Sequence, residues 1–314
     1  MKRTAIAVTL SAVVAMSAGA LMRAQAAGDE MIASVRAAIA AHDLARGDAI
    51  LKQYRSTSGT NSEAIEALSW LGRGALAEKQ LDAADRYAVE TYKLSVDALK
   101  KRKLDEDPHL QTALGAAIET QALVAVQRGA RSDAVAYLRS ELNKYRDSAI
   151  HKRIAKNINV LSLEGQPALP LQAAEYLDAP VPTFAQLKGK VVLMFFWAHW
   201  CPDCKANAPI IAKLLDKYRS RGLVIVAPTQ RYGYVEGGKT APPDEERRYI
   251  VQVRDTYYSF LRNQPVPVSE ANHRQYGVAS TPTIVLLDRA GVVRVYHPGR
   301  MTEEELEKAI SSLL

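Results

Sequence analysis

The sequence predicts two folded domains, an all-α part followed by an α/β part. From Asp29 to about Val160, Ala, Leu and Ile recur at spacings of three and four, as in amphipathic helices. After residue 188, short apolar runs alternate with helix-like stretches, which is typical of an α/β fold. Between them, residues 161–188 hold four helix-breaking prolines. We therefore expect one domain over 27–160 and another over 161–314, with the linker at about 161–188 included in the second.

The composition fits a folded globular protein. A chain of 314 residues can form two domains of roughly 150 residues each. Its content of 48% hydrophobic and 24% charged residues excludes the disordered, collagen-like and low-complexity classes. Its two cysteines, Cys201 and Cys204, exclude a disulfide-rich scaffold, a four-cysteine zinc site and an iron–sulfur cluster.

The net charge of +7 would suit a nucleic-acid binder only if it were concentrated in one domain. Residues 1–26 carry +3, and each predicted domain carries only +2. The basic run Lys100–Lys103 is followed by the acidic run Asp105–Asp107, which neutralises it at a distance and indicates a solvated loop. We expect no nucleic-acid partner.

The N-terminus has the pattern of an export signal. Lys2 and Arg3 precede an uncharged, largely apolar stretch over residues 4–22, and Ala24-Gln25-Ala26 forms a small-x-small cleavage site. The pattern predicts a signal peptide over residues 1–26 and a periplasmic or other extracytoplasmic location, where disulfides persist. The alternative is an uncleaved N-terminal membrane anchor, because the apolar stretch is almost long enough to span a bilayer.

The helical part contains a unit that resembles a tetratricopeptide repeat. Ser69-Trp70-Leu71-Gly72 is followed by Ala84 on the next predicted helix, and such small residues let paired helices pack closely. The matching positions in two weaker units, Gly47 and Ala134, lie 37 and 50 residues from Ala84, whereas a regular array repeats at about 34. We expect tetratricopeptide-like helical hairpins. They would form either a concave surface for a protein partner or a bundle that spaces or dimerises the molecule.

The α/β part can be divided into elements in chain order. The apolar runs 191–196 and 223–226 predict parallel strands that are buried on both faces. Helices are expected after Cys201 and within 244–263. Strands at 283–287 and 292–296 are joined by the turn sequence Asp288–Gly291. Thr302 and Glu305 form a capping box that opens the terminal helix.

The cysteines lie where the first of these strands meets its helix, in the run Cys201-Pro202-Asp203-Cys204 after Trp200. Free N–H groups and the positive end of the helix dipole stabilise a thiolate there, which lowers its pKa from about 8.5. Two intervening residues bring Cys204 round one helical turn, close enough to attack a mixed disulfide on Cys201. The spacing predicts Cys201 as an exposed nucleophile and Cys204 as the resolving thiol.

Together with these cysteines, three further motifs make residues 165–314 resemble the thioredoxin superfamily. They are Lys188–Leu193 before the first strand, Pro209 eight residues after Cys201, and Tyr276–Thr283 before a later strand. Within the superfamily, the chain is most similar to the exported TlpA/ResA-like thiol–disulfide oxidoreductases. The resemblance implies a thioredoxin fold, no bound cofactor, and protein thiols or disulfides as substrates. It also implies an exported or membrane electron donor.

The resemblance also assigns substrate-binding residues. It implies that Pro282 is cis and lies beside the active disulfide, which leaves an edge open to substrate. The Thr281 backbone would pair with an incoming peptide, and Trp200 and Pro282 would flank the reactive sulfur. The segment 231–265 is longer than its counterpart in plain thioredoxin and is either a specificity element or a surface loop.

Other chemistries fit the residues less well. The histidines at 199, 273 and 297 have no recognisable metal-ligand spacing, so we expect no metal. A purely structural disulfide would close a tiny loop and constrain the unfolded chain little. A peroxiredoxin would have Thr where this chain has Ala198. Trp197 is expected in the core, and His199 is expected to be a solvated neighbour of the cysteines.

The residues around the cysteines bear on proton transfer and on redox direction. Phe195 occupies the position where classical thioredoxin has a buried carboxylate, so the proton acceptor for Cys204 stays open. Asp203 repels a thiolate on Cys201, and Pro202 offers it no N–H, so both are expected to raise its pKa and favour a reductant.

These features predict an exported thiol–disulfide oxidoreductase that exchanges disulfides with protein thiols through its Cys-Pro-Asp-Cys site. We expect it to act as a reductant. The alternative is a non-catalytic scaffold. In that case the helical domain would recruit a protein, and the thioredoxin fold would be structural.

Overall fold

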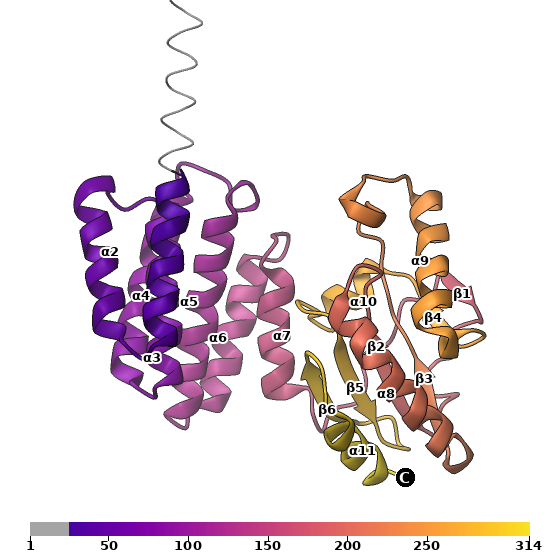
Figure 1. Ribbon diagram of the computed structural model, residues 1–314. Helices are drawn as coiled ribbons and strands as arrows, with labels where there is room; N and C mark the ends of the chain where they lie inside the picture. The colour runs from indigo at the N-terminus through magenta and orange to yellow at the C-terminus, as the bar shows by residue number, and fades with distance from the viewer. Residues whose placement is uncertain (1–24) are drawn as a thin grey trace, which may run out of the picture. The chain divides into compact units, whose positions relative to one another are not determined.

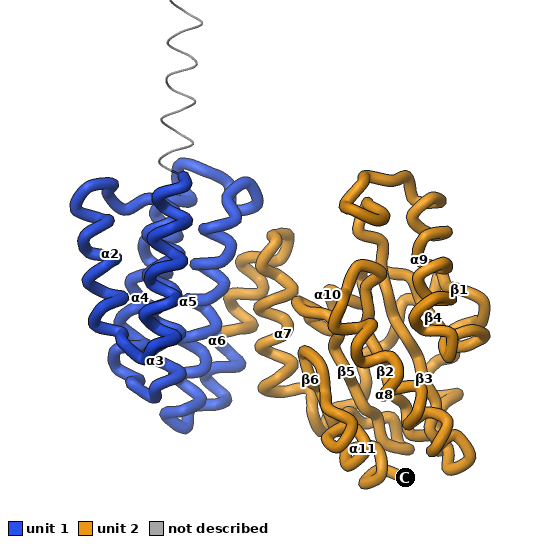
Figure 2. The backbone as a smooth tube through the Cα atoms, in the orientation of Figure 1, with its two compact units in different colours: residues 1–137 blue, residues 138–314 orange. Residues whose placement is uncertain are grey.

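A computed structural model describes residues 25–314 and divides the chain into two compact units, one ending at Tyr137 and one beginning at Leu138 (Figure 2). The predicted signal peptide and its alternative, a membrane anchor, fall on residues 1–24, outside the described part. Within residues 25–314, no helix combines the length and apolar character needed to cross a bilayer. The predicted boundary after residue 160 lies further along the chain than this division, and it stays a prediction.

The N-terminal unit is helical, as predicted (Figure 1). Asp43, Asn61 and Asp107 cap three of its helices, each accepting a hydrogen bond from the N–H three residues further on. After a helical stretch at residues 25–40, its elements are α2 (Leu44–Ser58), α3 (Ser62–Ala77), α4 (Leu81–Ala98), the 3₁₀ turn η1 (Leu104–Glu106), α5 (Pro108–Gln127) and the first part of α6 (Arg131–Lys144).

Small residues let these helices approach closely. A Cβ atom on Gly72 of α3 would lie 3.3 Å from Tyr87 Cβ of α4, and one on Gly47 of α2 would lie 2.9 Å from Leu71 Cδ2 of α3. Ala84 is fully buried in α4. The expected close packing at Gly47, Gly72 and Ala84 is therefore present, while the tetratricopeptide-like character of the stack stays a prediction.

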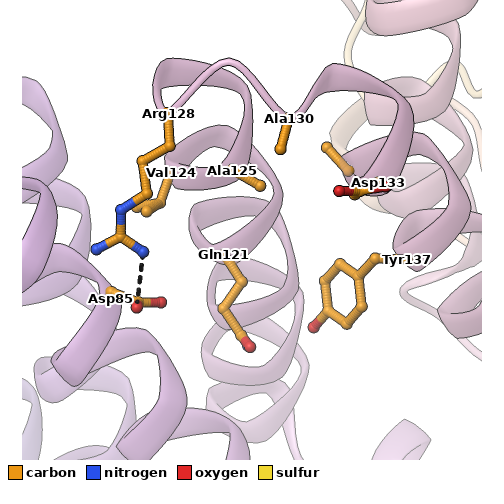
Figure 3. A pocket seen from close by; sticks show the side chains of 9 residues that line it. Asp85, Gln121, Val124, Ala125, Arg128, Ala130, Asp133 and Tyr137 are labelled. Atoms are coloured by element: carbon orange, nitrogen blue, oxygen red, sulfur yellow. Dashed lines mark hydrogen bonds and ion pairs between the residues drawn. The ribbon is translucent and has the colours of Figure 1, made fainter.

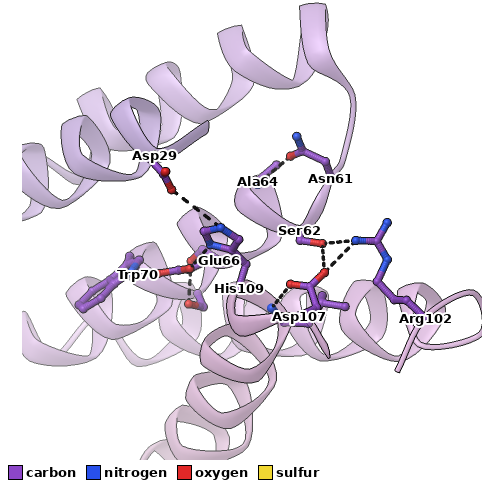
Figure 4. A network of polar contacts seen from close by, with 11 residues as sticks. Asp29, Asn61, Ser62, Ala64, Glu66, Trp70, Arg102, Asp107 and His109 are labelled. Atoms are coloured by element: carbon purple, nitrogen blue, oxygen red, sulfur yellow. Dashed lines mark hydrogen bonds and ion pairs between the residues drawn. The ribbon is translucent and has the colours of Figure 1, made fainter. Parts of the chain in front are cut away.

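A polar network joins the start of α3 to the start of α5 (Figure 4). The Asp107 carboxylate accepts hydrogen bonds from Ser62 Oγ at 2.6 Å and from Arg102 Nη1 at 2.8 Å. Nearby, His109 Nδ1 lies 2.7 Å from Glu66 Oε2. Because hydrogen bonds and an opposite charge compensate the burial of Asp107, the network fastens these two helices together.

The C-terminal unit is built on a four-stranded sheet of the predicted α/β kind. Its central strand β2 runs parallel to β3 and antiparallel to β5, which pairs in turn with β6. All six residues of β2 are buried, as expected of a strand covered on both faces. The turn at Asp288–Gly291 joins β5 to β6, as predicted. In spatial order the strands are β3 (Leu223–Val226), β2 (Val191–Phe196), β5 (Thr283–Leu287) and β6 (Val293–Pro298).

Helices cover both faces of this sheet. The face formed by Leu193 and Phe195 packs against α8 (Pro202–Tyr218) and α11 (Glu303–Ser311). On the other face, the Phe196 ring lies 5.5 Å from His273 of α10 (Glu270–Gln275). Helix α7 (His151–Ser162) packs against α10 and β6. The predicted capping box of Thr302 and Glu305 opens α11, and the 3₁₀ turn η2 (Arg219–Arg221) follows α8.

The segment 231–265 folds as a compact insertion. It contains the predicted helix, α9 (Pro243–Tyr257), between two 3₁₀ turns, η3 (Glu236–Gly238) and η4 (Ser259–Leu261). It leads into β4 (Pro265–Pro267), which pairs with β1 (Tyr176–Asp178) in a small antiparallel sheet. The sequence did not predict this pair, because strands of three residues are too short for an alternating pattern and β4 has proline at both ends.

Candidate active site

The candidate site lies where β2 ends and α8 begins. Trp197 is fully buried, as predicted, and its indole Nε1 donates to the Ala227 carbonyl at 3.1 Å. Thr229 Oγ1 donates to the Trp197 carbonyl at 2.9 Å. These bonds hold the end of β2 against the segment that follows β3. They place Cys201 at the N-cap of α8, with Pro202 at the first helical position, where a missing N–H is harmless.

The first turn of α8 brings the two free thiols together beside a cis peptide bond. Cys201 Sγ accepts a hydrogen bond from the Cys204 N–H at 3.0 Å. The protonated Cys201 thiol donates to the Thr281 carbonyl at 3.2 Å. The bond between Thr281 and Pro282 is cis, as the family resemblance implies. Cys201, Cys204, Thr281 and Pro282, predicted from separate motifs, thus meet at one place.

The two thiols differ strongly in acidity. Hydrogen bonding from Cys204, opposed by burial and helped by the Thr281 side chain, lowers the pKa of Cys201 to about 6. Burial and the neighbouring Cys201 raise the pKa of Cys204 well above its usual range. Negative charge at neutral pH therefore collects on Cys201, at the helix N-terminus.

The two opposing effects expected on the pKa of Cys201 are both present, and the lowering prevails. Asp203 raises this pKa, as expected, but hydrogen bonding from Cys204 and Thr281 outweighs it. The Asp203 side chain is 61% exposed and lies 3.7 Å from Arg300 Nη1, so water and an opposite charge screen it. The Cys204 N–H supplies the hydrogen bond that Pro202 cannot.

The expected exposure of Cys201 is wrong. Cys201 is 1% exposed and Cys204 is fully buried, whereas Trp200 beside them is 45% exposed. The ring of Tyr232, from the insertion, lies 5.5 Å from the Trp200 ring and packs against the core cluster that contains both cysteines. A helix-start motif cannot reveal this burial, because the core cluster around the cysteines includes residues from distant parts of the sequence.

His199 is not the solvated neighbour that the sequence predicted. Its side chain and that of Glu246 are each only 1% exposed, and His199 Nε2 lies 3.2 Å from Glu246 Oε1. Burial lowers the pKa of His199, although Glu246 opposes this. Glu246 comes from α9, 47 residues away, which is why no local pattern pointed to the pair.

Phe195 stands where classical thioredoxin has a buried carboxylate, and aromatic side chains surround it. Phe195 packs 6.1 Å from the ring of Tyr258, which also lies 4.7 Å from Trp197. Tyr258 is fully buried, and its hydroxyl has no hydrogen-bond partner in the described structure. The sequence did not single out Glu246 or Tyr258, and it pointed to Tyr232 only as part of the unusually long segment 231–265.

The described residues contain no cluster of three or more His, Cys, Asp or Glu side chains arranged to hold a metal ion. The site consists of the two thiols, the cis peptide segment and the aromatic residues around them.

Comparison with known proteins agrees with this geometry. Residues 183–313 match the family model of the thioredoxin-like domain. The C-terminal domain is thus a thioredoxin-like thiol–disulfide oxidoreductase domain. It is of the TlpA/ResA-like kind within the thioredoxin superfamily.

Two curated relatives illustrate the similarity. The chain is 29% identical over 147 residues to the thioredoxin-like protein YneN of Bacillus subtilis, covering 47% of this chain and 78% of YneN. It is 27% identical over 128 residues to the thiol-disulfide oxidoreductase ResA of Bacillus thuringiensis, covering 40% of this chain and 65% of ResA. Less than two thirds of ResA is therefore spanned.

Among solved structures, a thiol:disulfide interchange protein of the thioredoxin family from Chlorobium tepidum aligns with a TM-score of 0.38 at 19% identity. The alignment covers 48% of this chain and 96% of that chain. The family model and the sequence relatives carry the assignment.

Proposed function

We propose that this protein exchanges disulfides with protein thiols through Cys201-Pro202-Asp203-Cys204. Cys201 is the nucleophile and Cys204 the resolving thiol, and Trp200, Thr281 and Pro282 contact the substrate. The observation that carries the proposal is the unequal pair of thiols beside the cis peptide, with the pKa of Cys201 lowered to about 6 and that of Cys204 raised.

The reaction proceeds in two exchange steps. The Cys201 thiolate attacks a substrate disulfide, and a mixed disulfide forms as one substrate sulfur leaves as a thiolate. Cys204 then attacks the Cys201 sulfur, so that the bond between Cys201 and the substrate breaks and the bond between Cys201 and Cys204 forms. The proton lost by Cys204 balances the one gained by the leaving thiolate. The substrate gains two electrons, and an exported or membrane dithiol donor reduces the pair again. The cycle uses no bound cofactor.

The proposed direction is reductive. A stabilised thiolate makes a pair more oxidising, and strong oxidants of this fold have a nucleophile pKa of about 3.5, against about 7 in thioredoxin. The pKa of about 6 for Cys201 is nearer to that of the reductant thioredoxin than to that of the strong oxidants. Asp203 contributes by opposing the thiolate, although weakly. A measured reduction potential of about −120 mV would instead show a strong oxidant and contradict the reductive direction.

The proposed location is outside the cytoplasm, in the periplasm or an equivalent compartment. The N-terminal pattern of basic residues, apolar stretch and small-x-small triplet supports export. The uncleaved anchor is the alternative, and it would leave the redox site on the same side of the membrane.

We further propose that the helical unit recruits a protein partner as a tetratricopeptide-like stack. A hollow of about 350 Å³ on this unit supports the proposal (Figure 3). Arg128 stands at its rim and bonds Asp85 at 3.1 Å, while Tyr137 and Gln121 line it. The same hollow favours the second candidate function, a scaffold that binds a partner without redox chemistry.

Trapping distinguishes the two functions. A Cys204→Ser variant should accumulate mixed disulfides with its substrates, because the resolving step is blocked while Cys201 still attacks. The captured partners can be identified by mass spectrometry after diagonal electrophoresis. The control is the double variant Cys201→Ser with Cys204→Ser, which should capture nothing. If Cys204→Ser captures no more than this control, and Cys201→Ser keeps full activity in cells, the scaffold is the correct function.

A further inference from the structure

We propose that Tyr232 controls access to Cys201, that Glu246 is the positioning residue that holds Tyr232 in place, and that the preferred substrate carries its disulfide on a slender, extended segment. This inference rests on the proposed function and names its substrate class. It also explains how a reactive thiol can be almost completely covered.

Tyr232 packs beside the core that contains the two sulfurs. Its ring meets Trp200 edge-on at 5.5 Å and packs against the cluster that includes Cys201 and Cys204. Burial raises the pKa of Tyr232, and Cys204 and then Cys201 add to the effect, so its phenol lies within electrostatic reach of both sulfurs. Tyr232 comes from the insertion, whereas Trp200 and Cys201 belong to the core domain.

Glu246 joins the insertion to the strand end that carries the cysteines. Its carboxylate accepts a short hydrogen bond from the Tyr232 N–H and another, at 2.9 Å, from the Gly233 N–H. His199, two residues before Cys201, contacts the same carboxylate at 3.2 Å. A carboxylate that is 1% exposed is stable only with such partners. One side chain thus holds the backbone N–H groups of Tyr232 and Gly233 and the imidazole of His199.

Aromatic packing strengthens the connection. The rings of Tyr232, Tyr234 and Tyr249 surround His199 edge-on, with centroids at 5.4, 5.4 and 5.2 Å. Edge-to-face packing of this kind stabilises the arrangement beyond the area that it buries. The cover over Cys201 is therefore a packed part of the domain.

A fixed cover selects substrates by shape. With Cys201 1% exposed, a disulfide embedded in a rigid folded surface meets Tyr232 and Trp200 before its sulfur can reach Cys201. A disulfide on a flexible, extended segment can enter along the cis Pro282 edge, where the chain offers backbone groups for pairing. An unfolded or partly folded protein presents its disulfides in this way.

The experiment compares the reduction rates of two probes by the full chain. One is a short flexible peptide with an intramolecular disulfide, and the other is a rigid folded protein with a solvent-exposed disulfide. Wild type should reduce the peptide much faster. Tyr232→Ala and Glu246→Ala should each raise the rate with the rigid probe by about tenfold and leave the peptide rate within about threefold, because only the bulky approach is blocked.

Matched variants separate positioning from general damage. Tyr257→Ala removes an aromatic ring that is 50% exposed on the same insertion, and it should leave both rates unchanged. Glu246→Gln keeps one carbonyl oxygen, which can accept only one of the two backbone N–H bonds, so it should restore part of the selectivity lost in Glu246→Ala. Equal rate changes with the two probes, or unchanged selectivity in Tyr232→Ala, would overturn the inference.

The rate at which Cys201 is alkylated tests access to its sulfur even if the protein reduces neither disulfide probe. In the reduced protein, Tyr232→Ala should accelerate reaction with a bulky maleimide far more than with iodoacetamide. If wild type reduces neither disulfide probe, the proposed function fails, but this size dependence still reports the cover. If both probes are reduced and no size dependence is found, only the inference about Tyr232 and Glu246 fails.

Discussion

At the scale of single residues, Cys201 and Cys204 differ in acidity because they lie three residues apart at the start of one helix. Cys201 sits outside the helix and accepts the N–H of Cys204, so its thiolate is solvated by the protein. Cys204 lies inside the helix, fully buried, and has no comparable stabilisation. The same turn therefore makes one sulfur acidic and keeps the other neutral.

The ionisation of Cys201 predicts the pH dependence of its alkylation. Because its pKa is lowered to about 6, the thiolate fraction should rise as the pH passes through about 6 and be nearly complete at neutral pH. Pseudo-first-order rates of iodoacetamide modification of the reduced protein, followed by mass spectrometry, measure this midpoint. Cys201→Ser should be labelled only slowly, since Cys204 is buried and neutral. A midpoint near the ordinary value of about 8.5 would contradict the assignment.

At the scale of elements, α8 is joined to α11 and to the segment before it by one buried contact and one exposed contact. The buried Asn207 side chain donates to the Met301 carbonyl at 3.0 Å and accepts from the Met301 N–H at 3.3 Å. On the surface, Lys213 of the same helix pairs with Glu303 of α11. The Asn207 amide thus provides hydrogen-bond partners for the backbone of Met301, just before α11. These bonds hold α8, the helix that carries Cys204, against that segment.

Stability measurements should separate these two contacts. Asn207→Ala leaves two buried backbone groups of Met301 unpaired and is expected to lower the free energy of unfolding of the C-terminal unit by about 2–4 kcal/mol. Lys213→Ala removes a pair whose side chains are 64% and 42% exposed, and it should cost less than about 1 kcal/mol. Denaturant unfolding followed by tryptophan fluorescence compares them. Equal losses would show that the buried amide has no special role.

At the scale of the whole molecule, α7 belongs to the compact unit that contains the candidate site. Its backbone lies directly against Gly277, where an added Cβ would be 2.2 Å from the Lys156 nitrogen. Lys152 of α7 also pairs with Glu270 at 3.4 Å. Gly277 is four residues before Thr281, so α7 supports the segment that carries the cis peptide bond.

Two glycine substitutions test this support. Gly277→Ala must move the α7 backbone and also strains a residue with φ of +60°, so we expect a loss of about 4 kcal/mol or more in unfolding free energy. Gly299→Ala, at φ of +107° with open space around it, should show only the backbone strain, about 1–2 kcal/mol. Thermal and denaturant unfolding of the reduced proteins provide the comparison. Similar losses in both variants would mean that α7 does not pack tightly there.

The sequence by itself determined the main strands and helices around the site and the chemical class of the site. Apolar runs marked β2 and β3, a turn sequence marked the connection of β5 to β6, and Thr302 and Glu305 marked the start of α11. These features depend on neighbours within a few residues, and such local preferences can be read directly from the residue order. The spacing of the two cysteines indicated thiol chemistry, and the family resemblance of the motif around Pro282 added disulfide exchange.

Only the tertiary structure decided how covered and how acidic Cys201 is. Tyr232 packs against Trp200 and the core cluster around the cysteines, the carboxylate beside His199 comes from Glu246, and the carbonyl at Cys201 comes from Thr281. Each of these partners is at least thirty residues away along the chain, and several were invisible to any spacing rule. Burial and electrostatics depend on distance in space and not on distance in sequence, so the folded chain was needed to set them.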